Sequence, residues 1–148
     1  MRYTILTEYL YLRFLEAYRQ FYFEVYKKLP SEEYWKNFIM FVSQNMHNDN
    51  YLFLLAVEGK KVRGFCIVAP VINFEEIPTA IVEPLYVFPK WRNQGIGKNL
   101  IAIIKGWLKK KGYKKVITTE EFNKNTFKRK QKLLGLKPVR VILEKELE

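Results

Sequence analysis

Three residues at a fixed spacing, Arg92, Gly95 and Gly97, stand between a strand-like apolar run and an aliphatic, helix-like run. Glycines at such a junction let the backbone approach a ligand closely, and the first N–H groups of a helix have no partner within the helix. Those groups and the positive end of the helix dipole favour a bound anion such as a phosphate. The segment therefore predicts a backbone anion-binding cradle. The alternative, a dinucleotide fingerprint, would need a third glycine where Leu100 stands.

A carboxylate, Glu83, lies in the strand-like run before this cradle. Alternation along the run places Glu83 on the same face as Leu85 and Val87. A carboxylate within an apolar strand is unusual unless it is paired or functional, so Glu83 is either a salt-bridge partner at a strand end or a general base. The next residue, Pro84, cannot donate a ladder hydrogen bond and predicts a bulge or a splayed edge there.

Hydrophobic periodicity indicates the elements that must position these residues. Helices are expected over residues 8–28, 32–46, 95–111 and 124–134. Strands are expected over residues 2–6, 51–57, 62–72, 79–88, 114–119 and 139–147. This order predicts one domain, residues 1–148, of the α/β class: an α+β sandwich whose mixed, mostly antiparallel central sheet carries helices on both faces.

The motif resembles that of the GNAT superfamily of acetyl-coenzyme A-dependent N-acetyltransferases, which reads Gln/Arg-x-x-Gly-x-Gly/Ala and is matched by Arg92, Gly95 and Gly97. The resemblance implies a GNAT-like fold and transfer of an acetyl group from acetyl-coenzyme A to a primary amine by direct attack, without a metal. For such a reaction, the catalytic base that we predict from the position of Glu83 in its strand is that carboxylate. The coenzyme A contacts that the resemblance implies are Leu85, Tyr86, Val87, Arg92, Asn93, Gln94, Gly95, Ile96, Gly97, Lys98, Asn123 and Lys130.

One departure from the family pattern bears on the leaving thiolate. Members often carry a tyrosine four residues before the glycine that ends the fourth helix, as a general acid for the leaving thiolate; here that position is Gln131. Glutamine can hydrogen-bond a sulfur but cannot protonate it, so the source of that proton stays open. The departure also supports an alternative: a basic nucleic-acid-binding or coenzyme A-sensing module on the same fold, without turnover.

The positive charge of the chain is concentrated in its last part. Residues 1–89 contain nine Lys and Arg against ten Asp and Glu, whereas residues 90–148 contain 17 against five. Such an excess favours a phosphate-bearing partner, which acetyl-coenzyme A satisfies. We interpret the lysines of residues 109–115 as compensation of a helix C-terminus plus solvated surface, so nucleic acid is not expected as a partner.

The remaining composition excludes several classes of protein. One Cys and one His fall short of a zinc site, and a lone Cys66 cannot form an internal disulfide. No uncharged apolar run approaches the ~20 residues that span a bilayer. We therefore expect a cytoplasmic protein without a membrane partner. We expect the acceptor, which the sequence does not identify, to be a peptide or a small amine, and the resemblance leaves a homodimer open.

Overall fold

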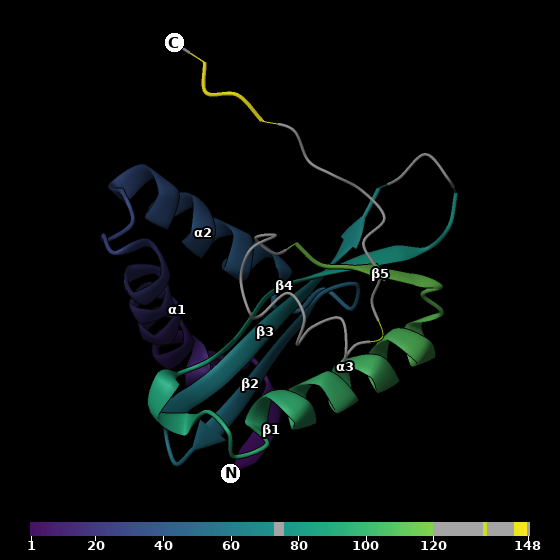
Figure 1. Ribbon diagram of the computed structural model, residues 1–148, viewed down its shortest axis with the longest axis horizontal. Coiled ribbons are helices and arrows are strands. Elements are labelled where there is room, and N and C mark those ends of the chain that lie inside the picture. Colours follow the sequence, from purple (N-terminus) through teal and green to yellow (C-terminus); the bar gives the residue numbers. More distant parts are fainter. Residues whose placement is uncertain (73–75, 120–134, 136–143, 148) are drawn as a thin grey trace. The chain divides into compact units, whose positions relative to one another are not determined.

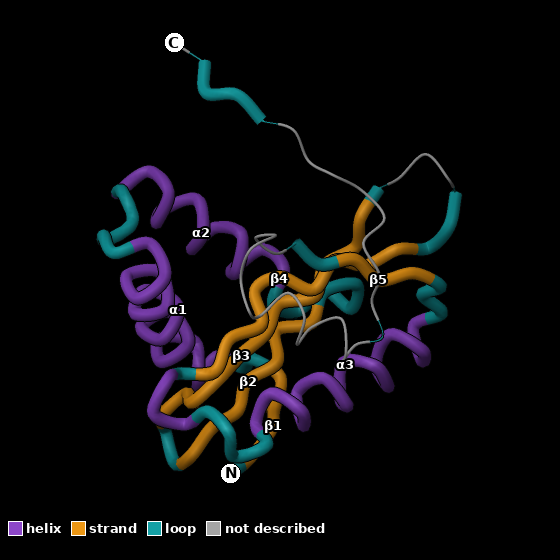
Figure 2. Tube along the Cα trace, viewed as in Figure 1, coloured by secondary structure: helices purple, strands orange, loops and turns teal. Residues whose placement is uncertain are grey.

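The computed structural model describes residues 1–72, 76–119, 135 and 144–147, in two compact units, Met1–Thr118 and Thr119–Glu148. All helices and strands of the described residues belong to the first unit; the residues outside the described ranges are grey in Figure 2. The expected helix over 124–134 lies outside the described residues, as do Asn123, Lys130 and Gln131. Of the strand expected over 139–147, residues 144–147 are described and form no strand. A single domain over the whole chain stays a prediction.

Five strands form one sheet in the order β1-β2-β3-β4-β5. Neighbours from β1 to β4 pair antiparallel, and β5 pairs parallel with β4. The predicted mixed, mostly antiparallel sheet is thereby confirmed. The bounds are β1 Arg2–Ile5, β2 Leu52–Glu58, β3 Lys61–Val71, β4 Thr79–Val87 and β5 Lys115–Ile117.

Helices cover both faces of this sheet, as predicted (Figure 1). Ser31 caps α2, because its Oγ accepts a hydrogen bond from the Tyr34 N–H at 3.2 Å. Gly112 ends α3 with a left-handed φ of 82°. The predicted first helix opens instead with a short 3-10 turn, and Thr7 makes no side-chain cap. The bounds are η1 Glu8–Leu10, α1 Tyr11–Tyr26, α2 Glu32–Asn45, η2 Pro89–Trp91 and α3 Ile96–Lys111.

Strand β2 is buried on both faces, which explains its continuous apolar sequence. One set of its side chains packs with α1 and α2, and the alternate set packs with α3. Two hydrophobic clusters therefore lie on opposite faces of one sheet. The first set is Phe53, Leu55 and Val57, and the second is Leu52, Leu54 and Ala56.

Candidate functional site

A β-bulge interrupts β4 at Glu83 and Pro84. The register pairs Val82 with Val68 and Leu85 with Cys66, so Glu83 and Pro84 together oppose the single residue between them, Ile67. The bulge predicted from Pro84 is confirmed.

The extra residue also changes the alternation of side chains along β4. Leu85 and Val87 pack in the cluster with α3, whereas Ile67, opposite the bulge, packs in the cluster with α1. Because residues opposite each other share a face, exposed Glu83 belongs to the α1 face. The prediction that Glu83 shares a face with Val87 is therefore wrong, since simple alternation omits the bulge.

Beyond the bulge, one edge of β4 has no partner strand among the described residues. Strand β5 pairs only with Thr79–Ile81, and no strand of the described residues continues that side. The Phe88 N–H donates to the Arg63 carbonyl at 3.0 Å, so the alternating antiparallel ladder turns the N–H and C=O groups of Leu85 and Val87 away from β3. We call these groups the open edge; Arg92 Nε donates to its Val87 carbonyl at 2.8 Å.

The predicted anion cradle, residues 92–98, begins a few residues after this edge. Gly95 is the N-cap of α3, with φ 85° and no side-chain capping bond. The Asn99 N–H donates to the Gly95 carbonyl at 3.0 Å, which leaves the N–H groups of Ile96, Gly97 and Lys98 without a helical acceptor. Among the described residues, the single atom within 4 Å of a Cβ on Gly97 would be Val87 Cγ2, at 3.8 Å, so these residues leave room in front of this glycine.

Gly64 of β3 allows α3 and the neighbouring strand β4 to approach each other closely. A Cβ at this position would lie 2.9 Å from the Tyr86 carbonyl oxygen and 3.4 Å from Ile96 Cγ2. Only glycine fits such an approach without displacing backbone. The first turn of α3 therefore sits close against the strands that present the open edge.

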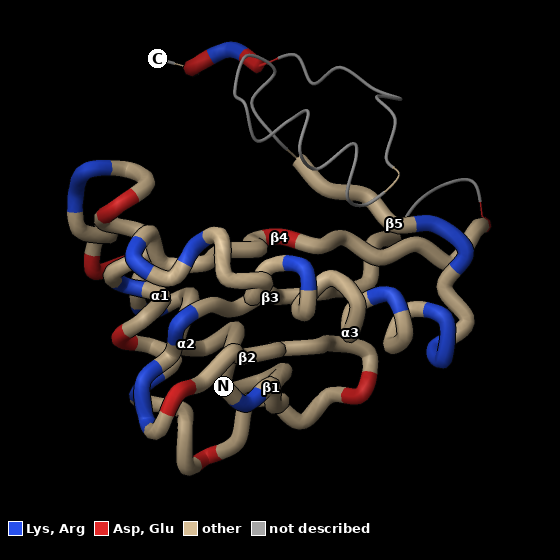
Figure 3. The backbone as a smooth tube through the Cα atoms, turned by 60° about the horizontal axis from the view of Figure 1, so that its bottom comes forward, with Lys and Arg blue, Asp and Glu red and all other residues tan. Residues whose placement is uncertain are grey.

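The described residues fit coenzyme A. The open edge offers the strand-like hydrogen bonds that the two amides of a pantetheine arm can take, and the uncapped N–H groups suit a pyrophosphate. Residues 84–119 contain nine Lys and Arg and no Asp or Glu. Figure 3 shows lysines along α3 and where β5 begins. Of the predicted contacts, the structure brings together all but Asn123 and Lys130, which lie outside the described residues.

On its α1 face, β4 carries an arrangement that the sequence did not reveal. The Tyr86 hydroxyl donates to a Glu24 oxygen, and Gln20 Nε2 donates to the other at 3.2 Å. The Arg92 guanidinium carbon lies 5.1 Å from the centroid of the Tyr86 ring. Burial first, and then the neighbouring Glu24 carboxylate, raise the pKa of the Tyr86 phenol well above its usual range. Because 62 residues separate Glu24 from Tyr86, no local pattern signals the contact.

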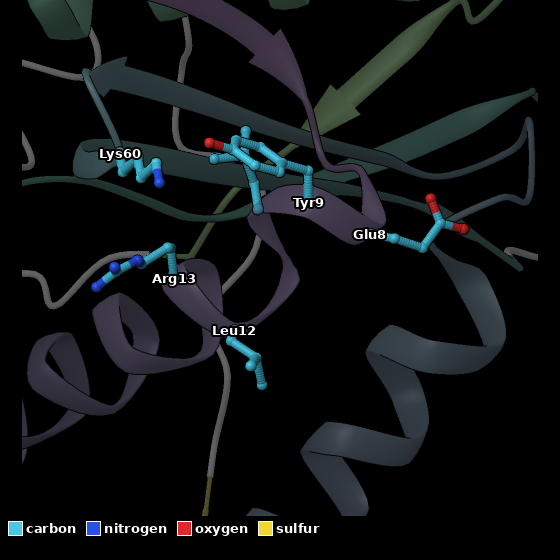
Figure 4. A pocket seen from close by; sticks show the side chains of 6 residues that line it. Glu8, Tyr9, Leu12, Arg13 and Lys60 are labelled. Atoms are coloured by element: carbon cyan, nitrogen blue, oxygen red, sulfur yellow. The ribbon is translucent and has the colours of Figure 1, made fainter.

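Two cavities lie near the α1 face. One, of about 370 Å³, is lined by Gln20, Glu24, Val62, Arg63, Phe88, Pro89, Lys90 and Trp91. The other, of about 210 Å³, surrounds η1; Lys60 and Arg13 lie on one side of Tyr9 and Glu8 on the other (Figure 4). Neither lining includes a predicted site residue, although the first cavity is lined by residues 88–91, between Val87 and Arg92.

Other chemistries find little support in the described residues. Cys66 pairs with Leu85 but is fully buried, and burial raises the pKa of its thiol well above the usual range, which disfavours a nucleophilic thiolate. Among residues 1–72, 76–119, 135 and 144–147, no three His, Cys, Asp or Glu side chains gather as metal ligands do. In that same part of the chain, no helix has the length and apolar character needed to cross a membrane.

Comparisons with known proteins agree with this geometry. Residues 11–135 match the model of the acetyltransferase (GNAT) family. A search of curated proteins gave no match.

Solved structures show the same fold at low sequence identity. A transcriptional regulator from Bacillus halodurans C-125 is 17% identical, with a TM-score of 0.77, 99% of this chain and 99% of that chain being covered. AAC(6')-Iy in complex with the bisubstrate analogue CoA-S-monomethyl-acetylneamine is 18% identical, with a TM-score of 0.74. The match covers 99% of this chain and 97% of that chain. Glucosamine-6-phosphate N-acetyltransferase from Arabidopsis thaliana is 15% identical (TM-score 0.71; 99% and 98% covered).

Proposed function

The chain belongs to the acetyltransferase (GNAT) family, and we propose that it transfers an acetyl group from acetyl-coenzyme A to the primary amine of a peptide or small acceptor. The observation that carries this proposal is the juxtaposition of the open edge of β4 with the uncapped N-terminus of α3. Similar structures are an acetyltransferase bound to a coenzyme A bisubstrate analogue and an amino-sugar N-acetyltransferase, which supports an amine as the acceptor.

The backbone supplies most of the binding of the co-substrate. The N–H groups of residues 93–98 would hold the pyrophosphate, and Arg92 and Lys98 would add positive charge beside it. The Val87 N–H belongs to the open edge. There it would donate to the acetyl carbonyl and stabilise negative charge that develops on that oxygen. When bound, acetyl-coenzyme A supplies the activated thioester, and the protein's contribution is mainly to position it.

Glu83 is our proposed proton acceptor for the incoming amine. A lysine-like amine has a pKa near ~10.4 and is mostly protonated at neutral pH, although only the neutral form attacks. Glu83 is exposed at the bulge, next to the open edge and on the face opposite α3. This position suits an amine that arrives from the α1 face and transfers its proton to Glu83 through ordered water.

Two measurements test the proposal. Calorimetry should show acetyl-coenzyme A binding, and a panel of peptides and small amines should include acceptors whose presence makes free thiol appear. Absence of binding would overturn the proposed function. Binding without thiol release from any acceptor would instead favour a coenzyme A-sensing module without turnover.

A further inference from the structure

The 370 Å³ cavity, called the α1 cavity below, adjoins the proposed acetyl site on the face away from α3. Phe88, in its lining, directly follows Val87 of the open edge. Glu24, also in its lining, binds the hydroxyl of Tyr86, the residue between Leu85 and Val87. Its volume is at the lower end of that of small-molecule sites, so it suits a small acceptor rather than a macromolecule.

Two cations flank one indole ring in the wall of this cavity. The guanidinium carbon of Arg63 lies 3.8 Å from the centroid of Trp91, and Lys90 Nζ lies 5.8 Å from it. Arg63 Nη2 donates to Glu58 at 3.1 Å, which fixes the plane of the guanidinium. Its Nε is buried and has no hydrogen-bond partner in the described part of the chain. Because the buried Nε is out of a ligand's reach, the donors left for an anionic group are the remaining guanidinium N–H groups of Arg63 and the ammonium of exposed Lys90.

The carboxylate lining the cavity is already engaged. Each Glu24 oxygen accepts one hydrogen bond, from Tyr86 or from Gln20. A carboxylate oxygen has a second lone pair, so Glu24 can still accept from an ammonium group. The lining therefore presents one negative group beside Tyr86 and two positive groups at Trp91, of which Arg63 is partly neutralised by its ion pair with Glu58, outside the lining. A ligand with one amine and one anionic group complements this distribution better than a simple amine or a polyamine does.

We propose that the α1 cavity binds the acceptor and selects a small amine that also carries a carboxylate or a phosphate. Lys90 and Arg63 bind the anionic group, while the amine end lies toward Glu24 and the open edge. This inference rests on the proposed acetyl transfer and names the class of acceptor for it. Lys90 and Arg63 then determine specificity and take no part in the chemical step.

The test uses two matched pairs of acceptors with the full-length protein. β-Alanine and β-alaninamide differ in a carboxylate, and phosphoethanolamine and ethanolamine differ in a phosphate. The amine of β-alaninamide is the less basic of its pair, so reactivity alone would favour the amide. We expect kcat/KM to be at least about tenfold higher for the anionic member of at least one pair. The pair that shows the preference identifies the anionic group.

Variants of the lining residues test whether the preference for the anionic acceptor arises in the α1 cavity. Lys90→Gln and Arg63→Gln should reduce it severalfold, through KM for the acceptor, with little change in acetyl-coenzyme A affinity. Lys109→Gln is the matched control, because this exposed lysine of α3 belongs to the opposite face and its loss changes the net charge equally. Binding without turnover is followed by the indole N–H resonance of Trp91, assigned with Trp91→Phe, which the anionic members should shift.

The outcomes separate this inference from the proposed function. If acetyl-coenzyme A binds and uncharged amines are acetylated as well as anionic ones, the selection of an anionic acceptor is wrong and acetyl transfer stands. Failure of all four probes to shift the Trp91 resonance or to release thiol would equally overturn the inference. If acetyl-coenzyme A itself does not bind, the proposed function fails first.

Discussion

The two faces of β4 build their binding groups in different ways. On the α3 face and along the open edge, the groups are backbone N–H and C=O, gathered within residues 85–98. On the α1 face they are side chains, and two of the contacts join distant segments: Glu24 of α1 meets Tyr86 of β4, and Arg63 of β3 meets Trp91 of η2. A ligand common to a whole family can be bound by backbone geometry, whereas a ligand specific to one member requires side chains of its own.

Gly97→Glu should have the largest effect, and it tests whether backbone groups at the N-terminus of α3 bind acetyl-coenzyme A. Of the described atoms, a Cβ there meets Val87 Cγ2 alone, at 3.8 Å, so the fold should accept the substitution while the carboxylate occupies the phosphate position. We expect acetyl-coenzyme A affinity to fall by at least about 10³-fold, or ~4 kcal/mol, by calorimetry, with an unchanged melting temperature.

Gly106→Glu is the control for this prediction. It makes the same change on the same helix, at an exposed glycine whose Cβ would meet nothing within 4 Å. Gly106 lies about 13 Å along α3 from Gly97, well beyond the first turn. If both variants bind acetyl-coenzyme A as tightly as the wild type does, the phosphate does not bind at the N-terminus of α3.

Glu83→Gln tests whether the bulge places chemistry on the α1 face. A positioned base contributes about 10²–10⁴-fold, so kcat/KM should fall by at least about 10²-fold near pH 7, with acetyl-coenzyme A affinity nearly intact. The deficit should shrink as pH rises, because more of the acceptor amine is then already neutral. A deficit that does not vary with pH would indicate substrate positioning, and wild-type activity would exclude Glu83 from the mechanism.

Tyr86→Phe measures what one side-chain contact on the α1 face contributes to stability. A hydrogen bond to a carboxylate contributes about 1.5–3 kcal/mol, and partial exposure of Glu24 lowers our expected loss in free energy of unfolding to about 1–2 kcal/mol at pH 7. Denaturant titrations measure it. Tyr9→Phe is the control, since the Tyr9 side chain is 68% exposed, and it should change stability by less than about 0.5 kcal/mol.

The pH dependence of this loss has a definite sign. Folding raises the pKa of the Tyr86 phenol, so its contribution is fully present below the unfolded value near ~10 and is lost as pH rises toward the folded value. The difference between wild type and Tyr86→Phe should therefore narrow above about pH 10. A difference that widens there would mean that the phenolate, not the phenol, is stabilised in the folded protein.

Cys66→Ala should have the smallest effect on activity. Cys66 pairs with Leu85, next to the open edge, but burial raises the pKa of its thiol, and direct attack needs no acyl-enzyme. We expect kcat/KM to change by less than about threefold, and the native thiol to resist a disulfide reagent until the protein unfolds. A loss of 10²-fold would instead indicate a covalent intermediate.

The fold and the anion cradle of residues 92–98 could be predicted from the sequence because their signals are local. Ser31 and Gly112 are capping residues whose positions mark helix ends directly. The anion cradle is contiguous, and its glycine spacing specifies a backbone path whatever the neighbouring side chains are. The first helix was less accurately predicted, since its apolar spacing continues through Leu10, where the chain forms a 3-10 turn.

The arrangement of side chains on the α1 face became known only from the tertiary structure. One extra residue in β4 moves Glu83 to the face opposite Leu85 and Val87, and Pro84 predicts a bulge without specifying which residues it pairs with β3. The partners of Tyr86 and Trp91 come from α1 and β3, whose approach depends on the packing of the whole sheet. Sequence alone therefore predicted the position of the anion cradle, through local backbone conformation. The side chains that meet an acceptor depend on strand register and helix packing, which no single segment encodes.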